Sequence, residues 1–104
     1  MKSKLVRDNI PTIIREAGKI PVTHIASGDE AKQATIAKVF EELSEFQDNP
    51  CLEEAADVYQ AFMMMISVHD LRFDDVISAA VAKNHIKGRF DKLIILDKIL
   101  DEQG

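Results

Sequence analysis

Hydrophobic positions recur at helical spacing along most of the chain and predict an all-α protein. Between residue 27 and about residue 47, apolar residues return every three or four positions, which places them on one helix face. Ser27 with Glu30 at the third helical position is typical of a capping box at the start of this helix. The stripe expected to form its core contact comprises Ile36, Val39, Phe40, Leu43 and Phe46.

A second long helix is expected after the break at residues 48–50, with Asn49 as its N-cap and Pro50 as its first residue. This helix is apolar on nearly all sides, which is typical of a buried helix. One side carries Leu52, Ala55, Ala56, Tyr59, Phe62, Met63 and Ile66. The second side carries Val58, Ala61, Met64, Met65 and Val68. We therefore expect the second side to meet either more of the same chain or another subunit.

The two ends of the chain are less regular than its middle. Toward the N-terminus, the pattern predicts one or two helical turns over residues 12–18 and weak strand character over residues 19–26. Toward the C-terminus, it predicts a third long helix over about residues 74–86, which Gly88 ends. Residues 93–96 (LIIL) fit either a short strand or the start of a terminal helix. The expected fold is thus an all-α helical bundle with short irregular or strand-like terminal segments.

Two acidic pairs stand on the two central helices. Glu42 and Glu45, and then Glu54 and Asp57, are each three residues apart, so each pair shares one helix face, and antiparallel packing would bring the pairs together. Glu54 and Asp57 lie on the second, apolar side, and no Lys or Arg occurs between residues 47 and 72 to neutralise them. Two interpretations stay open: a site for Mg²⁺, with Mn²⁺ as an alternative, or carboxylates at a solvated helix edge.

Length and charge narrow the classes of function. The 104 residues are expected to form one domain with a modest core, which favours self-association. A formal net charge of −5 disfavours binding to nucleic acid or to an anionic membrane. The central apolar run, residues 61–68, is far shorter than the roughly 20 residues of a membrane span. With no apolar leader and the single cysteine Cys51, a cytoplasmic location is expected.

Cationic residues are concentrated toward the two ends of the chain, and most are expected to be solvated. Those that fold back over the helices would be able to bind phosphate oxygens. Asn84, on the apolar face of the third helix, fits either a contact to a nucleoside or a satisfied core amide. The cations are Lys2, Lys4, Arg7, Arg15, Lys83, Lys87, Arg89 and Lys92.

The acidic pattern resembles that of the all-α nucleoside triphosphate pyrophosphohydrolases related to MazG and to phosphoribosyl-ATP pyrophosphohydrolase. In that family Glu-x-x-Glu is followed on the next helix by Glu-x-x-Asp, which stands here as Glu42, Glu45, Glu54 and Asp57. The segments KLVRDNIPTII (residues 4–14) and IKGRFDKLIIL (residues 86–96) are also similar to a house-cleaning branch of that family.

The resemblance implies a MazG-like bundle that assembles as a homodimer or a dimer of dimers, with Mg²⁺ held by the four acids. It implies hydrolysis of a nucleoside triphosphate between the α- and β-phosphates, which releases the monophosphate and pyrophosphate. Glu41 and Glu42 are then the candidates for the catalytic carboxylate. The residues expected at the substrate are Lys4, Arg7, Lys83 and Lys87 near the phosphates and Asn84 near the nucleoside.

Two alternatives remain beside this hypothesis. In the first, the substrate is phosphoribosyl-ATP, and the chemistry is otherwise the same. In the second, the chain is a non-enzymatic helical interaction module whose methionine-rich side docks a partner protein and whose acids keep one edge solvated.

Overall fold

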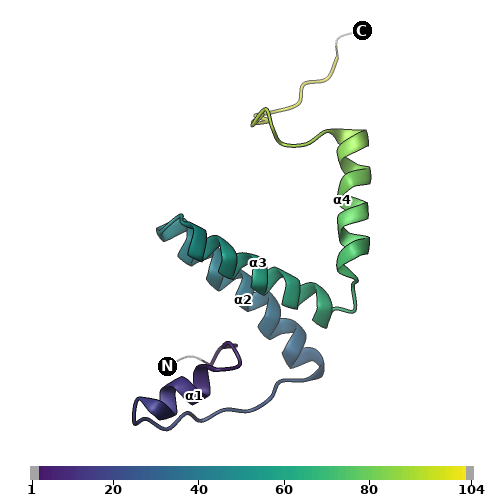
Figure 1. The fold of residues 1–104 in the computed structure, drawn as a ribbon. Coiled ribbons are helices and arrows are strands. Elements are labelled where there is room, and N and C mark those ends of the chain that lie inside the picture. The colour runs from purple at the N-terminus through teal and green to yellow at the C-terminus, as the bar shows by residue number, and fades with distance from the viewer. Residues whose placement is uncertain (1–2, 103–104) are drawn as a thin grey trace. The chain divides into compact units, whose positions relative to one another are not determined.

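The computed structural model describes residues 3–102, and within them every regular element is a helix (Figure 1). The elements are α1 (Ile10–Glu16), α2 (Gly28–Asp48), α3 (Leu52–Val68) and α4 (Phe73–Lys87). The chain divides into two compact units between Phe73 and Asp74, and each unit is described by itself. No helix among the described residues has both the length and the apolar content needed to cross a bilayer. The all-α prediction is confirmed.

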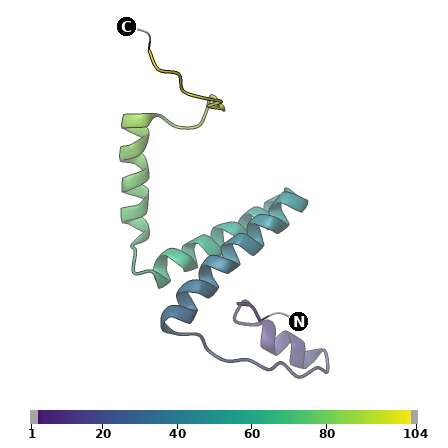
Figure 2. The same cartoon turned by 180° about the vertical axis from the view of Figure 1, so that it is seen from behind.

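In the first unit, α2 and α3 form an antiparallel hairpin and lie side by side in both views (Figures 1 and 2). Asn49, Pro50 and Cys51 connect the two helices. Pro50 disfavours a helical backbone at the residue before it, and Asn49 accordingly has φ −147° and ψ 78°. Cys51 is extended as well, so α3 begins at Leu52. Asn49 therefore ends α2, and its predicted role as N-cap of the next helix is wrong.

The other helix ends follow local backbone chemistry. Gly18 (φ 79°) and Gly88 (φ 85°) adopt the left-handed conformation that stops α1 and α4, as predicted from their positions. At the start of α2, however, the Ser27 side chain makes no capping hydrogen bond. The Glu30 carboxylate lies 2.9 Å from His24 Nε2 instead. The predicted capping box is wrong, because the glutamate that would complete it contacts a side chain upstream of the helix.

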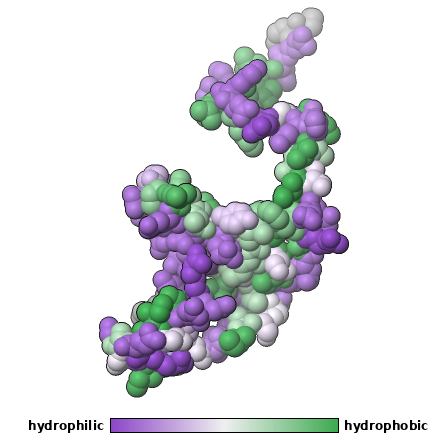
Figure 3. All heavy atoms as spheres, viewed as in Figure 1, coloured by the Kyte–Doolittle hydropathy of each residue, from purple (hydrophilic) through white to green (hydrophobic). Residues whose placement is uncertain are grey.

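The seam between α2 and α3 is lined by a different face of α2 from the one predicted. The buried residues of α2 are Thr35 and Glu42. Four of the five residues of the predicted core stripe, Ile36, Phe40, Leu43 and Phe46, are exposed at the surface of this unit, Phe40 to 68%. A hairpin of two helices can bury only one face of each, and here that face carries the carboxylates. Figure 3 shows hydrophobic residues beside hydrophilic ones on the visible surface of this unit.

The segments expected to have strand character are irregular throughout the described part of the chain. Ile20, Val22 and Ile25 are each about nine-tenths exposed, between α1 and α2. In the second unit, residues 93–96 form neither a strand nor a helix and are also exposed. A strand needs a neighbouring strand to satisfy its backbone hydrogen bonds, and residues 3–102 contain none. The strand-like part of the prediction is wrong for these residues.

Candidate metal centre

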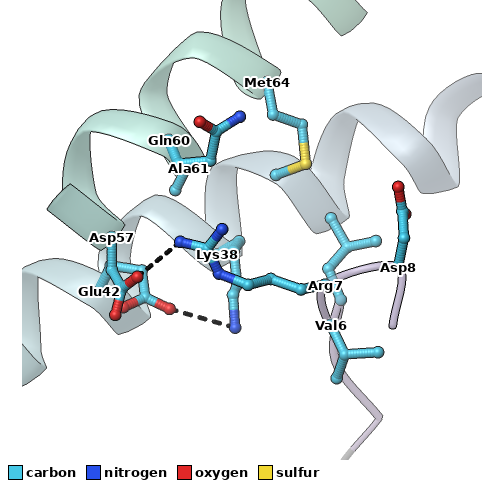
Figure 4. A pocket seen from close by; sticks show the side chains of 10 residues that line it. Val6, Arg7, Asp8, Lys38, Glu42, Asp57, Gln60, Ala61 and Met64 are labelled. Carbon is cyan, nitrogen blue, oxygen red and sulfur yellow. Dashed lines mark hydrogen bonds and ion pairs between the residues drawn. The ribbon is translucent and has the colours of Figure 1, made fainter. Parts of the chain in front are cut away.

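Three of the four predicted acids converge at the seam of the hairpin. Glu42 of α2 and Glu54 and Asp57 of α3 each place one carboxylate oxygen within 4.8 Å of the other two. In an antiparallel hairpin, residues about equally far from the turn lie level with one another, which explains why Glu42 meets Asp57. Figure 4 shows these two carboxylates side by side.

The cluster is unusual because part of it is buried without a partner. Glu42 retains only 7% of its exposure. Its Oε2 atom and Oε2 of Glu54 are shielded from solvent and have no hydrogen-bond donor among the described residues. A buried carboxylate oxygen without a donor destabilises the fold, typically by about 1–3 kcal/mol or more for a charged group. Such an oxygen fits a cation as its missing partner.

Two cationic side chains each lie beside one other oxygen of the cluster (Figure 4). Lys38 Nζ donates to Glu41 Oε2 and lies 3.2 Å from Glu42 Oε1. Arg7 Nη2, from the segment before α1, donates to Asp57 Oδ1 at 2.6 Å. Sequence reasoning missed Lys38, although its spacing of three and four residues from Glu41 and Glu42 is the signal for such a contact.

The carboxylates differ in acidity because of these contacts. Burial raises the pKa of Glu42, and although the hydrogen bond from Lys38 opposes the shift, the nearby charge of Glu45 adds to it. Burial also acts to raise the pKa of Glu41, but hydrogen bonds from Lys4 and Lys38 outweigh it, so that pKa is lowered. The hydrogen bond to Glu41 in turn raises the pKa of Lys4. Glu41 is thus the more acidic of the two neighbours.

The other predicted site residues have distinct positions. Glu45 is exposed and outside the three-acid cluster, although it is close enough to Glu42 to affect its pKa. Lys4 Nζ donates to Glu41 at 3.0 Å, so with Arg7 it ties the N-terminal segment to the hairpin. The remaining three predicted substrate residues stand in the last turns of α4, in the second unit, and are exposed. For these three, Lys83, Asn84 and Lys87, a substrate contact stays a prediction.

A hollow of about 340 Å³ opens beside the cluster in the first unit. Its polar wall includes Glu42, Asp57 and Gln60, and the N-terminal segment and α3 contribute apolar side chains (Figure 4). Sequence reasoning did not single out Gln60, which adds an amide beside the carboxylates. The lining comprises Leu5, Val6, Arg7, Asp8, Lys38, Glu42, Asp57, Gln60, Ala61 and Met64.

The residues present fit a divalent cation that prefers oxygen ligands. The ligands would be carboxylates, and two buried oxygens have no donor among the described residues. Separations up to 4.8 Å are near the roughly 4.2 Å between ligands on opposite sides of Mg²⁺. Comparisons of the chain with protein-family models, with curated proteins and with solved structures gave no match. Function is therefore inferred from the geometry of this cluster together with the sequence resemblance.

Proposed function

We propose that the protein is a Mg²⁺-dependent hydrolase that cleaves nucleoside triphosphates into the monophosphate and pyrophosphate. One observation carries the proposal: three carboxylates converge at a half-buried seam, and two of their buried oxygens have no donor in the described chain. Two of the three acids, Glu42 and Asp57, line a hollow that Arg7 and Lys38 also line. The resemblance of the sequence to MazG-like enzymes selects this reaction, with a role in clearing surplus nucleotides in the cytoplasm.

Each side chain of the centre has a separate task in this proposal. Glu42, Glu54 and Asp57 would hold the metal. Bound Mg²⁺ neutralises phosphate charge and orients the substrate and a water molecule for displacement at phosphorus. The side chain of Arg7 is 61% exposed. Its guanidinium has the geometry to donate hydrogen bonds to two phosphate oxygens at once. Val6 and Met64 supply apolar surface beside the polar wall.

The proton of the attacking water passes to a carboxylate that lysines do not already engage. Both oxygens of Glu41 accept hydrogen bonds from lysines, and its lowered pKa makes it a weak base. We therefore assign Glu41 to holding the N-terminal segment in place. Glu45 is exposed beside Glu42 and takes part in none of the ion pairs found among residues 3–102. It is the better candidate for proton acceptance.

The enzyme is proposed to work as a homodimer or a dimer of dimers. Ile36, Phe40 and Leu43 form an exposed apolar stripe on α2, and among residues 3–73 no other helix covers it. A second copy of the same stripe would bury this surface in an isologous contact. The apolar residues on the outer side of α3, such as Leu52 and Tyr59, extend the surface that such a contact would cover.

Turnover with a panel of substrates tests the reaction. Each triphosphate, and phosphoribosyl-ATP beside them, is incubated with the pure protein and Mg²⁺, and pyrophosphate and orthophosphate are measured separately. We expect equal amounts of monophosphate and pyrophosphate, and at least about a 100-fold loss when Glu54→Gln and Asp57→Asn are combined. Asp48→Asn, an exposed acid at the end of α2, is the matched control and should leave turnover unchanged. Orthophosphate as the first product, or no turnover, contradicts the proposal.

A non-enzymatic interaction module is the second candidate, and the exposed apolar side of α2 favours it. The thermal stability of the protein with and without metal separates the two candidates. A ligand that binds only the folded state stabilises it by about 2.7 kcal/mol at 100 times its Kd. The enzyme should therefore melt at a higher temperature in Mg²⁺ or Mn²⁺, and the Glu54→Gln, Asp57→Asn variant should lose that rise. Identical responses of parent and variant would favour the interaction module.

A further inference from the structure

The two cations at the acidic cluster are held in very different ways. Lys38 belongs to α2, is 16% exposed at its side chain and lies between two glutamates of the same helix. Arg7 belongs to an irregular segment fifty positions away from its partner in sequence, and its side chain is 61% exposed. Lys38 is therefore a fixed part of the hairpin, whereas Arg7 reaches the cluster from outside.

The cluster combines two buried oxygens that have no donor among the described residues with one carboxylate that Arg7 engages. Glu42 is more than nine-tenths buried, and its Oε2, like that of Glu54, has no donor among the described residues. Asp57, the third acid, has Oδ1 engaged by Arg7 at 2.6 Å. A divalent ion that uses all three acids would stand beside a guanidinium bonded to one of its own ligands, and like charges this close repel each other.

We propose that Arg7 is a displaceable counter-ion of the metal centre. Without metal it neutralises Asp57 and keeps the N-terminal segment against the hairpin, and a divalent ion releases it from that carboxylate. The freed guanidinium then lies beside the hollow and binds a phosphate group of the incoming nucleotide. This inference rests on the proposed function, because it assigns a coupled role to a residue of the same site.

If Arg7 exchanges partners in this way, removal of its charge should change the affinities for metal and for nucleotide in opposite directions. Removal of the Arg7 charge eliminates a competitor of the metal, so the metal alone should bind more tightly. The same change removes a phosphate contact, so a nucleotide should bind less tightly in the presence of metal. If Arg7 only stabilised the fold, its removal would weaken the binding of both ligands, because the binding sites for metal and nucleotide would be lost together.

Titration with Mn²⁺ alone, followed by calorimetry at fixed pH and ionic strength, measures the first effect. We expect Arg7→Gln to lower the Kd for Mn²⁺ about two- to fivefold, the range given by an exposed ion pair. Arg7→Lys should fall between Arg7→Gln and the parent, because a lysine retains the charge without the planar fork. Arg15→Gln, which makes the same change of charge at an exposed site on α1, should leave the Kd unchanged. The melting temperature of each variant, taken in EDTA, verifies that it is folded.

A second titration uses a non-hydrolysable triphosphate analogue in saturating Mn²⁺, for which Arg7→Gln should raise the Kd relative to Arg15→Gln. If the parent binds no Mn²⁺, both the proposed function and this inference are overturned. If the parent binds Mn²⁺ and Arg7→Gln binds it equally well or more weakly than Arg15→Gln, displacement is overturned while the metal centre stands. Tighter Mn²⁺ binding without a change for the analogue would support displacement and overturn the transfer of Arg7 to phosphate.

Discussion

The inner and outer faces of α2 differ in a direction opposite to that of an ordinary amphipathic helix. The inner face, against α3, presents Thr35, Lys38 and Glu42, and Glu42 is only 7% exposed. The outer face presents Ile36 and Phe40, and Phe40 is 68% exposed. Surface helices usually turn apolar residues toward the core and charged residues toward water. In this hairpin the arrangement is reversed at these positions.

Buried carboxylates in the seam are more consistent with the proposed metal centre than with a purely stabilising interface. Buried charges seldom stabilise a fold better than apolar side chains of the same volume. Glu42 and Glu54 nevertheless place oxygens inside the seam without donors from the described chain. The outer face has the complementary property, since its apolar residues would gain from burial and no helix in the described part of the first unit covers them. The inner face therefore fits a metal, and the outer face fits a second copy.

The largest expected effect comes from a charge placed on the outer face. Phe40→Glu should weaken self-association at least about 100-fold, because an isologous interface would contain the new charge twice. Sedimentation velocity over a concentration series measures the change. Thr12→Glu, on an exposed position of α1, is the control with the same added charge. The outer face would lose its proposed role if the parent were a monomer at every concentration, or if Phe40→Glu associated as the parent does.

The next effect concerns the lysine of the inner face. Lys38→Met should lower the free energy of unfolding by about 2 kcal/mol, because Glu42 loses its cation at 3.2 Å in a poorly solvated seam, whereas Glu41 loses one of two lysines and keeps Lys4. Urea denaturation in EDTA measures it, and Lys32→Met, exposed on the same helix, is the control. Saturating Mg²⁺ should restore part of the loss. An equal effect of the two substitutions would mean that the inner face does not depend on Lys38.

The smallest effect has the opposite sign. Glu42→Gln in EDTA should raise the free energy of unfolding at neutral pH by about 1 kcal/mol, because the charge of a buried carboxylate is removed. Lys38 keeps Glu41 as a partner, so no cation is left unpaired. Saturating Mg²⁺ should reverse the ranking, because the parent retains a metal ligand that the variant lacks.

The pH dependence of that difference follows from the raised pKa of Glu42. Folding favours the protonated form of Glu42 relative to the unfolded state. Glu42 therefore adds to the free energy of unfolding at pH values below the ordinary pKa of glutamate, and this contribution is lost as the pH rises through the raised pKa. The variant has no such group. The free energy of unfolding of Glu42→Gln should therefore exceed that of the parent by more at neutral pH than at acidic pH. Denaturation series across this pH range measure the difference. A difference that narrowed with rising pH would contradict the burial of an ionised Glu42.

The sequence predicted much of the local structure but less of the packing. Helical spacing indicated both central helices, and the break near Pro50 placed the turn between them. The acidic spacing also indicated which carboxylates would meet, and three of them do so. Lys38 was not predicted as the counter-ion, although its spacing of three and four residues from Glu41 and Glu42 places it on their helix face. The capping pattern at Ser27 and Glu30 failed because His24 competes for the glutamate.

By itself, the sequence determined which residues form helices and where the acids stand on them, because periodicity, glycine and proline act over a few residues. Only the tertiary structure decided which face of α2 turns toward α3, since both faces of each helix contain apolar residues and the hairpin can bury just one. It also decided that Arg7 reaches Asp57, a contact between residues fifty positions apart that no local pattern records. Local rules fix the elements, whereas the choice between faces depends on contacts between residues that are far apart in the sequence.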